Sequence, residues 1–324
     1  MTEAAAKVQV AFWPSIAGRE IEASLRTIPG AELAVVDDLD KLPAAAPGIE
    51  ALVIGGHFFD SRVAEALRTR AKRLRFIQSF TAGYEGLQAH GVPPGVVVAN
   101  AGESWSPAVA EHGMALLLAL VKCLPQAILN QSRGLWDRSH TARMGSLERQ
   151  TLAIVGYGSI GREFARRARP FGMHIVGLSR RAMPDPLADE VQTMSALHAV
   201  LARADVVLVA VPYSRETHHL IGAKELAACK PGAILINVAR GGLVDPAALA
   251  AALSSGQLGA AGTDVTEPEP LPPGDPLWGA PNLIITPHVA GASGPVGRAR
   301  LAGFVAANVA RFVAGEPVSC VVTL

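Results

Sequence analysis

The stretch LAIVGYGSIGREFARR, residues 152–167, decides the fold of this 324-residue chain. It runs from a short apolar segment through a turn with glycines at G-x-G-x-x-G spacing into a helical pattern. Between a strand and a helix, such glycines permit a tight turn and bring a pyrophosphate close to the helix N-terminus. The motif alone is a weak signal, but the strand before it, the helix after it and a second strand ending near residue 179 make it specific. The expected cofactor contacts in this turn are Gly156, Gly158, Ser159, Ile160 and Gly161.

Six apolar runs between residues 152 and 287 have the length of buried strands and are separated by helix-like stretches. Strands that alternate with helices form a parallel sheet covered on both faces. Six such strands complete a doubly wound dinucleotide-binding sheet, so we predict a Rossmann domain over residues 103–292. The runs are LAIVG (152–156), HIVGLS (174–179), VVLVAV (206–211), AILINVA (233–239), AAGTDV (260–265) and LIITP (283–287).

The first hundred residues repeat this alternation, which predicts a second, flavodoxin-like parallel sheet. Its runs are VQVAFW (8–13), AELAVV (31–36), ALVIGG (51–56), LRFIQSF (74–80) and VVVANA (96–101). Residues 298–314 carry apolar side chains at helical spacing without a strand partner nearby, so we expect this helix to return to the first sheet. The predicted fold is α/β, with two doubly wound parallel-sheet domains. The Rossmann cofactor domain is inserted into a substrate-binding domain made of residues 1–102 and 293–324.

A long apolar helix is predicted after Ser106, which suits an N-cap and is followed by Pro107 at the first helical position. The segment AVAEHGMALLLALVKCL (108–124) is apolar almost all the way round. A helix of this kind must be buried on more than one side. We therefore expect it to pack against a second subunit.

Charge and cysteine content exclude several classes of function. Lys and Arg number 29 against 28 Asp and Glu, and a formal charge of +1 gives no global attraction to nucleic acid or an anionic membrane. The N-terminal MTEAAAK lacks a signal-peptide core, and the longest apolar run, 114–121, is far shorter than a membrane span. Cys123, Cys229 and Cys320 lie far apart, which predicts neither a disulfide framework nor a metal site. We expect a cytoplasmic protein with no metal, no nucleic-acid partner and no membrane partner.

Three predicted strands end in side chains that can act together. Arg240 follows one strand, Glu269 lies in the Pro-rich loop after the next, and His288 comes one residue past a third. The carboxyl ends of parallel strands line the ligand crevice of an open sheet, so these residues can converge there. Arg offers a planar fork for a carboxylate, His a proton near neutral pH, and Glu orients the imidazole and favours its charged form. Each residue alone is more often structural or solvated, but the three together predict a catalytic set.

The stretch GLSRR, residues 177–181, lies where a dinucleotide fold usually carries an acidic residue for the adenosine ribose. Ser179 removes the carboxylate that would repel a 2′-phosphate, and Arg180 and Arg181 can form charge-assisted contacts with it. The stretch therefore predicts NADP(H) as the preferred cofactor. The alternative is that both arginines are solvated loop residues and that NAD(H) is accepted equally well.

Five ordered motifs resemble those of the D-isomer-specific 2-hydroxyacid dehydrogenase family. They are VGYGSIG (155–161), VPYSRETHHLIG (211–222), NVARGGLVD (237–245), DVTEPEPLP (264–272) and TPHVAG (286–291). Within them, the further candidate cofactor contacts are Val211, Pro212, Val238, Asp264 and Gly291. In the first domain, SFTAGYEGL (79–87) is more weakly similar to the family's substrate loop, and VAEHGMALLLAL (109–120) to its dimer-forming helix.

The resemblance implies a two-domain subunit, usually in a homodimer, that moves a hydride between a nicotinamide cofactor and C2 of a small 2-oxo or D-2-hydroxy acid. Glyoxylate and hydroxypyruvate are the leading substrates. It implies that Arg240 binds the substrate's carboxylate and carbonyl, and that His288 is the acid/base supported by Glu269. It also implies that the backbone amides of Ala82 and Gly83 bind the carboxylate.

The chain departs from the family pattern at Thr266, where many relatives have an aromatic residue. This difference bears on the identity of the substrate and not on the class of reaction. Glu269 argues against the formate-oxidising branch, which has Gln beside the His. The rival hypothesis is a cofactor-sensing, corepressor-like binding protein without significant turnover, since such proteins retain the same three residues.

Overall fold

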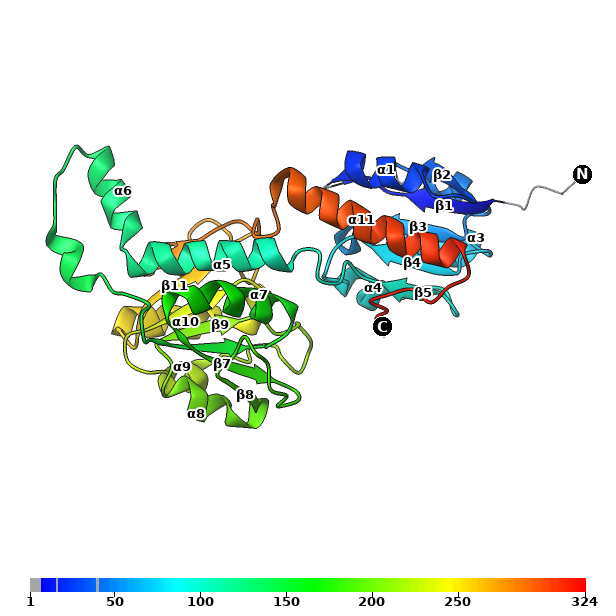
Figure 1. The fold of residues 1–324 in the computed structure, drawn as a ribbon. Coiled ribbons are helices and arrows are strands. Elements are labelled where there is room, and N and C mark those ends of the chain that lie inside the picture. Colours follow the sequence, from blue (N-terminus) through cyan, green and yellow to red (C-terminus); the bar gives the residue numbers. More distant parts are fainter. Residues whose placement is uncertain (1–6, 16, 39–40) are drawn as a thin grey trace, which may run out of the picture. The chain divides into compact units, whose positions relative to one another are not determined.

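The computed structural model describes residues 7–15, 17–38 and 41–324. The chain divides into two compact units, one formed by Met1–Trp105 with Ser293–Leu324 and the other by Ser106–Ala292. Each unit contains one parallel sheet, and helices connect its strands, as the ribbon in Figure 1 shows for both. The predicted fold class, two doubly wound parallel-sheet α/β domains, is confirmed.

The sheet of the first unit has five parallel strands in the order β2-β1-β3-β4-β5. The strands are β1 (Val8–Phe12), β2 (Ala31–Val35), β3 (Ala51–Ile54), β4 (Phe76–Ser79) and β5 (Val97–Ala99). Successive side chains of β1 point to opposite faces, so Val10 and Phe12 enter one core cluster and Ala11 another. From β1 the chain adds β2 on one side and then β3, β4 and β5 on the other side. Sheets of this order bind ligands between β1 and β3, where the strand order reverses.

Helices cover both faces of this sheet. They are α1 (Gly18–Arg26), α2 (Leu42–Ala45), α3 (Ser61–Arg70), α4 (Glu85–His90) and α11 (Gly294–Val313), with a 3₁₀ turn η1 (Gly56–Phe58) after β3. Helix α11 comes from the far end of the chain and packs along α1, orange-red beside blue in Figure 1. It buries Leu301, Val305 and Val309 in the same cluster as Phe12 and Phe76. Both ends of the chain therefore share one core.

The sheet of the second unit has seven parallel strands in the order β12-β11-β10-β9-β6-β7-β8. They are β6 (Thr151–Val155), β7 (His174–Ser179), β8 (Glu190–Thr193), β9 (Val206–Val209), β10 (Ala233–Asn237), β11 (Leu258–Thr263) and β12 (Leu283–Ile285). Six coincide with the predicted runs. The prediction of six strands was incomplete, because β8 reads EVQT, pairs only with β7 at the sheet edge and lacks an apolar run.

The helices of this unit are α5 (Ser106–Val121), α6 (Leu124–Ser132), α7 (Ser159–Ala168), α8 (Leu197–Leu201), α9 (Ala223–Ala228) and α10 (Pro246–Ser255). Its 3₁₀ turns are η2 (Ser139–Arg143), η3 (Arg169–Phe171), η4 (Met194–Ala196), η5 (Gly241–Leu243) and η6 (Pro276–Gly279). Helix α5 packs against α7, β10 and β11, and most of its side chains are buried.

The apolar helix predicted to continue to Leu124 ends earlier, at Val121. Cys123 has a φ of 50°, a left-handed conformation that an α-helix cannot contain, and α6 begins at the next residue. Within the described residues, no single helix has both the length and the apolar character of a membrane span. Helices α5 and α6 meet that standard only as a pair bent by 69°.

Candidate active site

The glycine turn joins β6 to α7. A Cβ at Gly156 would overlap the amide nitrogen of Val211, and the φ of 102° at Gly156 also favours glycine. A Cβ at Gly161 would lie 2.7 Å from the carbonyl oxygen of Gly156. At Gly158, in contrast, a Cβ would meet no atom within 4 Å. Gly156 therefore lets the turn pack against the residues after β9, Gly161 lets the start of α7 pack against the turn, and Gly158 borders open space.

The N-terminus of α7 offers donors to an anion. Its N-cap residue, Gly158, has no side chain that could cap the helix. The first-turn N–H groups, those of Ser159, Ile160 and Gly161 among them, have no acceptor within the helix and lie at the positive end of its dipole. The hydroxyl of Ser106 in α5 donates to Oγ of Ser159 over 3.0 Å, which fixes the start of the helix.

The predicted 2′-phosphate residues form a short turn at the carboxyl end of β7. Ser179 is the last residue of the strand, and its Oγ donates to the carbonyl oxygen of Arg181 over 2.5 Å. The side chains of Arg180 and Arg181 are exposed. Strand β7 lies next to β6, so this turn and the glycine turn follow neighbouring strands. Two exposed cations at this place suit an anionic part of a cofactor.

The sequence analysis missed an acidic residue beside the glycine turn. Asp185, in the loop after β7, accepts a hydrogen bond from the hydroxyl of Tyr157 over 3.2 Å and forms an ion pair with Arg162 of α7. Burial, together with the nearby Asp185 carboxylate, raises the pKa of the Tyr157 hydroxyl. The only signal in the sequence was an acid six residues past the strand end, which does not reveal its partners.

Glu269 and His288 are in direct contact. Nδ1 of His288 lies 2.5 Å from Oε1 of Glu269, and the two side chains are 44% and 41% exposed. His288 has a φ of 53°, a conformation that costs energy for a residue with a side chain. Its backbone N–H donates to the carbonyl oxygen of Asp264 over 2.8 Å, which holds it in this conformation.

Asp264 lies behind this pair, with a side chain that is 1% exposed. Its carboxylate accepts hydrogen bonds from the N–H groups of Val289 and Ala290, at 3.0 and 2.7 Å, and from the hydroxyl of Thr286 at 2.6 Å. Nε2 of His112 in α5 is 2.8 Å from the same hydroxyl. In the structure, the carboxylate of Asp264 therefore organises the loop that carries His288. The predicted contact of Asp264 with the cofactor stays a prediction.

Arg240 lies at the carboxyl end of β10, the strand next to β11. Its Nη1 donates to the carbonyl oxygen of Ala239 over 2.7 Å, and its own carbonyl oxygen accepts from Nδ2 of Asn237 over 2.9 Å. A Cβ on Gly241 would overlap the backbone carbonyl of Thr266. The turn after Arg240 therefore packs directly against the loop that leads to Glu269.

The remaining predicted cofactor residues follow neighbouring strands of the same sheet. Val211 and Pro212 come after β9, Val238 after β10 and Gly291 after β12. Val211 and Val238 are buried, whereas Pro212 is exposed and Gly291 is half-buried.

In the first unit, the predicted substrate loop follows β4. Oγ1 of Thr81 donates to the carbonyl oxygen of Gly83 over 2.7 Å and accepts from the N–H of Gly56 over 2.9 Å. Nδ2 of Asn100 donates to the carbonyl oxygen of Ala82 over 3.0 Å. With both carbonyl groups engaged, the backbone of Ala82 and Gly83 is held in one conformation.

The family model described as D-isomer specific 2-hydroxyacid dehydrogenase, NAD binding domain, matches residues 114–290. The chain belongs to the D-isomer specific 2-hydroxyacid dehydrogenase family. It is similar to the glyoxylate reductase of Thermococcus gammatolerans, with 35% identity over 81% of this chain and 78% of the relative. It is also 34% identical to the D-3-phosphoglycerate dehydrogenase of Methanocaldococcus jannaschii, over 82% of this chain and 50% of the relative. The chain thus spans about half the length of that second dehydrogenase.

Solved structures of the family share this fold. A D-isomer specific 2-hydroxyacid dehydrogenase family protein from Aeromonas salmonicida is 32% identical, with a TM-score of 0.86 over 98% of this chain and 99% of that chain. A D-isomer specific 2-hydroxyacid dehydrogenase from Xanthobacter autotrophicus, in complex with NADPH and MES, is 27% identical, with a TM-score of 0.82 over 98% of both chains. The chain is therefore a family member in sequence and in fold.

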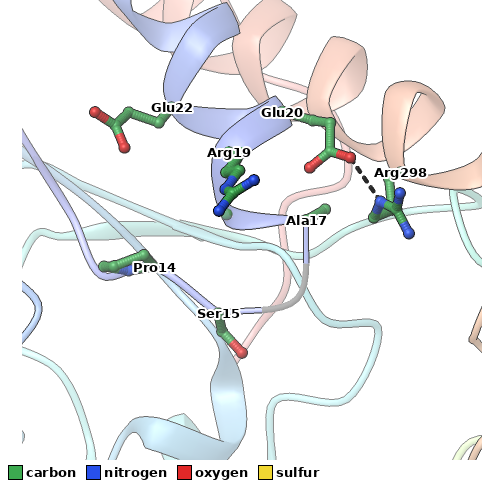
Figure 2. Close-up of a pocket in the computed structure, with 8 residues that line it drawn as sticks. Pro14, Ser15, Ala17, Arg19, Glu20, Glu22 and Arg298 are labelled. Carbon is green, nitrogen blue, oxygen red and sulfur yellow. Dashed lines mark hydrogen bonds and ion pairs between the residues drawn. The ribbon is translucent and has the colours of Figure 1, made fainter. Parts of the chain in front are cut away.

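The first unit of this dehydrogenase family member also contains a hollow of about 460 Å³ at the N-terminus of α1, shown in Figure 2. Nε of Arg298 in α11 donates to Oε1 of Glu20 in α1 over 2.6 Å, the dashed line in Figure 2, and this hydrogen bond lowers the pKa of Glu20. The described lining includes no predicted site residue. We therefore regard this ion pair as a structural contact that helps hold α11 against α1.

Proposed function

We propose that this protein transfers a hydride between NADP(H) and C2 of a small 2-oxo or D-2-hydroxy acid, with glyoxylate or hydroxypyruvate as its principal substrate. The 2.5 Å contact between His288 and Glu269, beyond the strand ends of a dinucleotide-binding sheet, carries the proposal. Family membership supports the reaction class. The relatives are named after different substrates, so the choice of substrate is part of the proposal.

His288 acts as the acid that protonates the substrate oxygen during reduction. Because Nδ1 faces the Glu269 carboxylate, that nitrogen carries a proton and Nε2 is left for the substrate. In the reducing direction, Nε2 donates its proton to the substrate oxygen. When bound, the nicotinamide cofactor supplies the hydride. In the oxidation direction, Nε2 accepts the proton of the substrate hydroxyl.

Arg240 binds the carboxylate of the substrate. Its guanidinium is planar and can donate two parallel hydrogen bonds, which suits a carboxylate better than the point charge of a lysine. The packing of Gly241 against Thr266 fixes the start of the turn relative to the Glu269 loop. We also assign the backbone amides of Ala82 and Gly83 to a substrate carboxylate.

The cofactor is assigned to the glycine turn and the turn after β7. The open space at Gly158 and the first-turn amides of α7 would hold the pyrophosphate. Ser179, Arg180 and Arg181 would hold the 2′-phosphate of NADP(H). The related dehydrogenase that was solved with NADPH supports this assignment. The preference for NADP(H) over NAD(H) rests on the two arginines and the missing acid.

We further propose a homodimer whose interface includes α6 and the residues after it. Ile128, Leu135 and Trp136 are 64%, 53% and 96% exposed in the single chain. In Figure 1, α6 and the segment that returns to β6 extend away from the sheet of their own unit. Clustered exposed apolar side chains of this kind mark protein interfaces. A cytoplasmic location without nucleic-acid or membrane partners stays a prediction.

The test of the proposed function is steady-state turnover of glyoxylate, hydroxypyruvate, pyruvate and 3-phosphohydroxypyruvate with NADPH and with NADH. We expect the highest kcat/KM for glyoxylate or hydroxypyruvate with NADPH. Preferred turnover of the phosphorylated acid would contradict the proposed substrate. Tight cofactor binding with no turnover of any acid would support the corepressor-like alternative instead.

A further inference from the structure

His219 contacts both loops that carry the proposed catalytic residues. It lies between β9 and α9. Its backbone N–H donates to the carbonyl oxygen of Gly242 over 2.7 Å, in the turn after Arg240. Its Nε2 lies 2.8 Å from Oε2 of Glu267, in the loop that carries Glu269. One residue therefore joins the Arg240 turn to the Glu269 loop.

The two loops also touch each other where glycine is required. A Cβ on Gly241 would overlap the carbonyl group of Thr266, and a Cβ on Gly242 would lie 2.9 Å from Oε1 of Glu267. The two loops are therefore already in close contact, and a further link between them can act only against their separation. The hydrogen bond between His219 and Glu267 opposes that separation from the side of the segment after β9.

We infer that His219 is a positioning residue, which holds the Glu269 loop against the Arg240 turn through Glu267 and so keeps Glu269 at Nδ1 of His288. The inference rests on the proposed function for the roles of these catalytic residues. The side chains of His219 and Glu267 are 35% and 38% exposed, so the contact is partly shielded from water. A hydrogen bond to a carboxylate is stronger than one between neutral groups.

The same side chains invite comparison with a metal site. Three atoms that could bind a metal, one each from His218, His219 and Glu267, lie within 4.8 Å of one another. Zinc needs its nitrogen and oxygen ligands about 2.0–2.2 Å from the ion, with the ion between them. Here His219 and Glu267 bond directly to each other, and Nδ1 of His218 is 3.1 Å from the hydroxyl of Tyr213. The contacts therefore favour a hydrogen-bonded link, and a bound metal is one outcome of the test.

The experiment compares His219→Ala and His219→Gln with a matched control, His198→Ala. His198 makes a similar surface contact, with Nε2 3.0 Å from Oε1 of Glu225, a residue of α9 and not of the Arg240 turn or the Glu269 loop. We expect His219→Ala to lower kcat for 2-oxo acid reduction about tenfold, a part of the 100-fold or greater loss expected when a general acid is removed. KM for the cofactor should change little. His219→Gln keeps an N–H donor toward Glu267 and should retain most of kcat.

Hydrogen exchange provides a readout that does not need turnover. In His219→Ala, the backbone amides of the non-proline residues within 264–272 should exchange faster, whereas in His198→Ala they should not. If wild-type protein turns over no tested acid, the proposed function fails, and the exchange result still decides whether the link exists. Adding His219→Ala to Glu269→Gln should lower kcat no further, because both changes remove the same support.

Three results would overturn the inference. The first is a His219→Ala variant with unchanged kcat and unchanged exchange. The second is an equal loss in His198→Ala, which would indicate general destabilisation. The third is stoichiometric zinc in untagged wild-type protein, combined with EDTA treatment that reproduces the His219→Ala phenotype. That third result would replace the hydrogen-bonded link by a metal site.

Discussion

Nδ1 of His288 and Oε1 of Glu269 lie 2.5 Å apart, although 19 residues separate them in the sequence. They meet because their loops follow adjacent parallel strands, β12 and β11. The backbone N–H of His288 donates to the carbonyl oxygen of Asp264, so the position of the His288 backbone depends on the end of the sheet. The variants His288→Ala and Glu269→Gln test this pair directly.

His288→Ala should nearly abolish turnover, because it removes the group that acts on the reacting oxygen. The expected loss of kcat is about 100-fold to 10,000-fold. Cofactor affinity, measured by calorimetry, should stay close to that of the wild type. A variant with more than half of the wild-type kcat would exclude His288 from the mechanism.

Arg240→Lys should severely lower kcat/KM for 2-oxo acids while cofactor binding is retained. A lysine keeps the charge but cannot form the planar two-pronged contact with a carboxylate. Arg300→Lys is the matched control, since Arg300 lies in α11 outside the predicted site. Unchanged substrate kinetics in Arg240→Lys would leave Arg240 as a structural residue at the strand end.

Glu269→Gln should lower kcat for 2-oxo acid reduction, though less than His288→Ala does. Nδ1 of His288 lies 2.5 Å from Oε1 of Glu269, and an amide oxygen accepts a hydrogen bond more weakly than a carboxylate, so the imidazole is held less firmly. KM for the cofactor should change little. The measurement is kcat and KM for both proteins with one saturating 2-oxo acid, and a wild-type kcat in Glu269→Gln would argue against a functional pair.

The wild type should prefer NADPH to NADH by about tenfold or more, since one charge-assisted hydrogen bond contributes roughly 1.5 to 3 kcal/mol. The double variant Ser179→Asp with Arg180→Ala should move this preference toward NADH. Values of kcat/KM for both cofactors with one saturating 2-oxo acid provide the comparison. Equal or better use of NADH by the wild type, or an unmoved preference in the variant, would refute the assignment.

Glu190 should stabilise the edge strand β8 in a pH-dependent way. Hydrogen bonds from Arg203 and then His174 lower the pKa of its carboxyl to about 2. This stabilisation is complete above the unfolded-state pKa, near 4.3, and is lost as the pH falls toward 2. Glu190→Gln should lower the free energy of unfolding by roughly 0.2–1 kcal/mol near neutral pH, as for other exposed ion pairs.

Urea unfolding at several pH values tests this prediction, with Glu216→Gln as an exposed control. The difference between wild type and Glu190→Gln should shrink as the pH is lowered from about 5 to about 2. A difference that is independent of pH would show that the charge of Glu190 is not its cause.

The elements that the sequence predicts are those with a local signature. Apolar runs of strand length indicate β6 and β9, and glycine spacing indicates the turn between β6 and α7, because both depend on neighbouring residues alone. Strand β8 escaped prediction since EVQT becomes a strand only through its pairing with β7. The break between α5 and α6 depends on one backbone angle, at Cys123, for which no residue type is a reliable signal.

The residue types of the candidate site were predicted from the sequence, but the hydrogen bonds that hold these residues in place were not. Glu269 and His288 stand at strand ends, and a parallel sheet brings such positions together. The partners of Asp185 and of His219 could not be read from the sequence, because they come from polar side chains at irregular spacing on separate segments of the chain. The catalytic and cofactor roles themselves stay predictions until they are measured.

The return of α11 to the first sheet has a consequence for biosynthesis. A ribosome that makes about 5–20 residues per second needs roughly 10 to 40 s to pass from Ser106 to Ala292. During that time the apolar face around Phe12 and Phe76 lacks Leu301 and Val305, the side chains that pack in the same core. The second unit is continuous in sequence and can fold as it emerges, whereas the first cannot be completed until the last helix has been synthesised. The nascent N-terminal sheet thus keeps an apolar face uncovered while the second unit is made, a condition that favours aggregation.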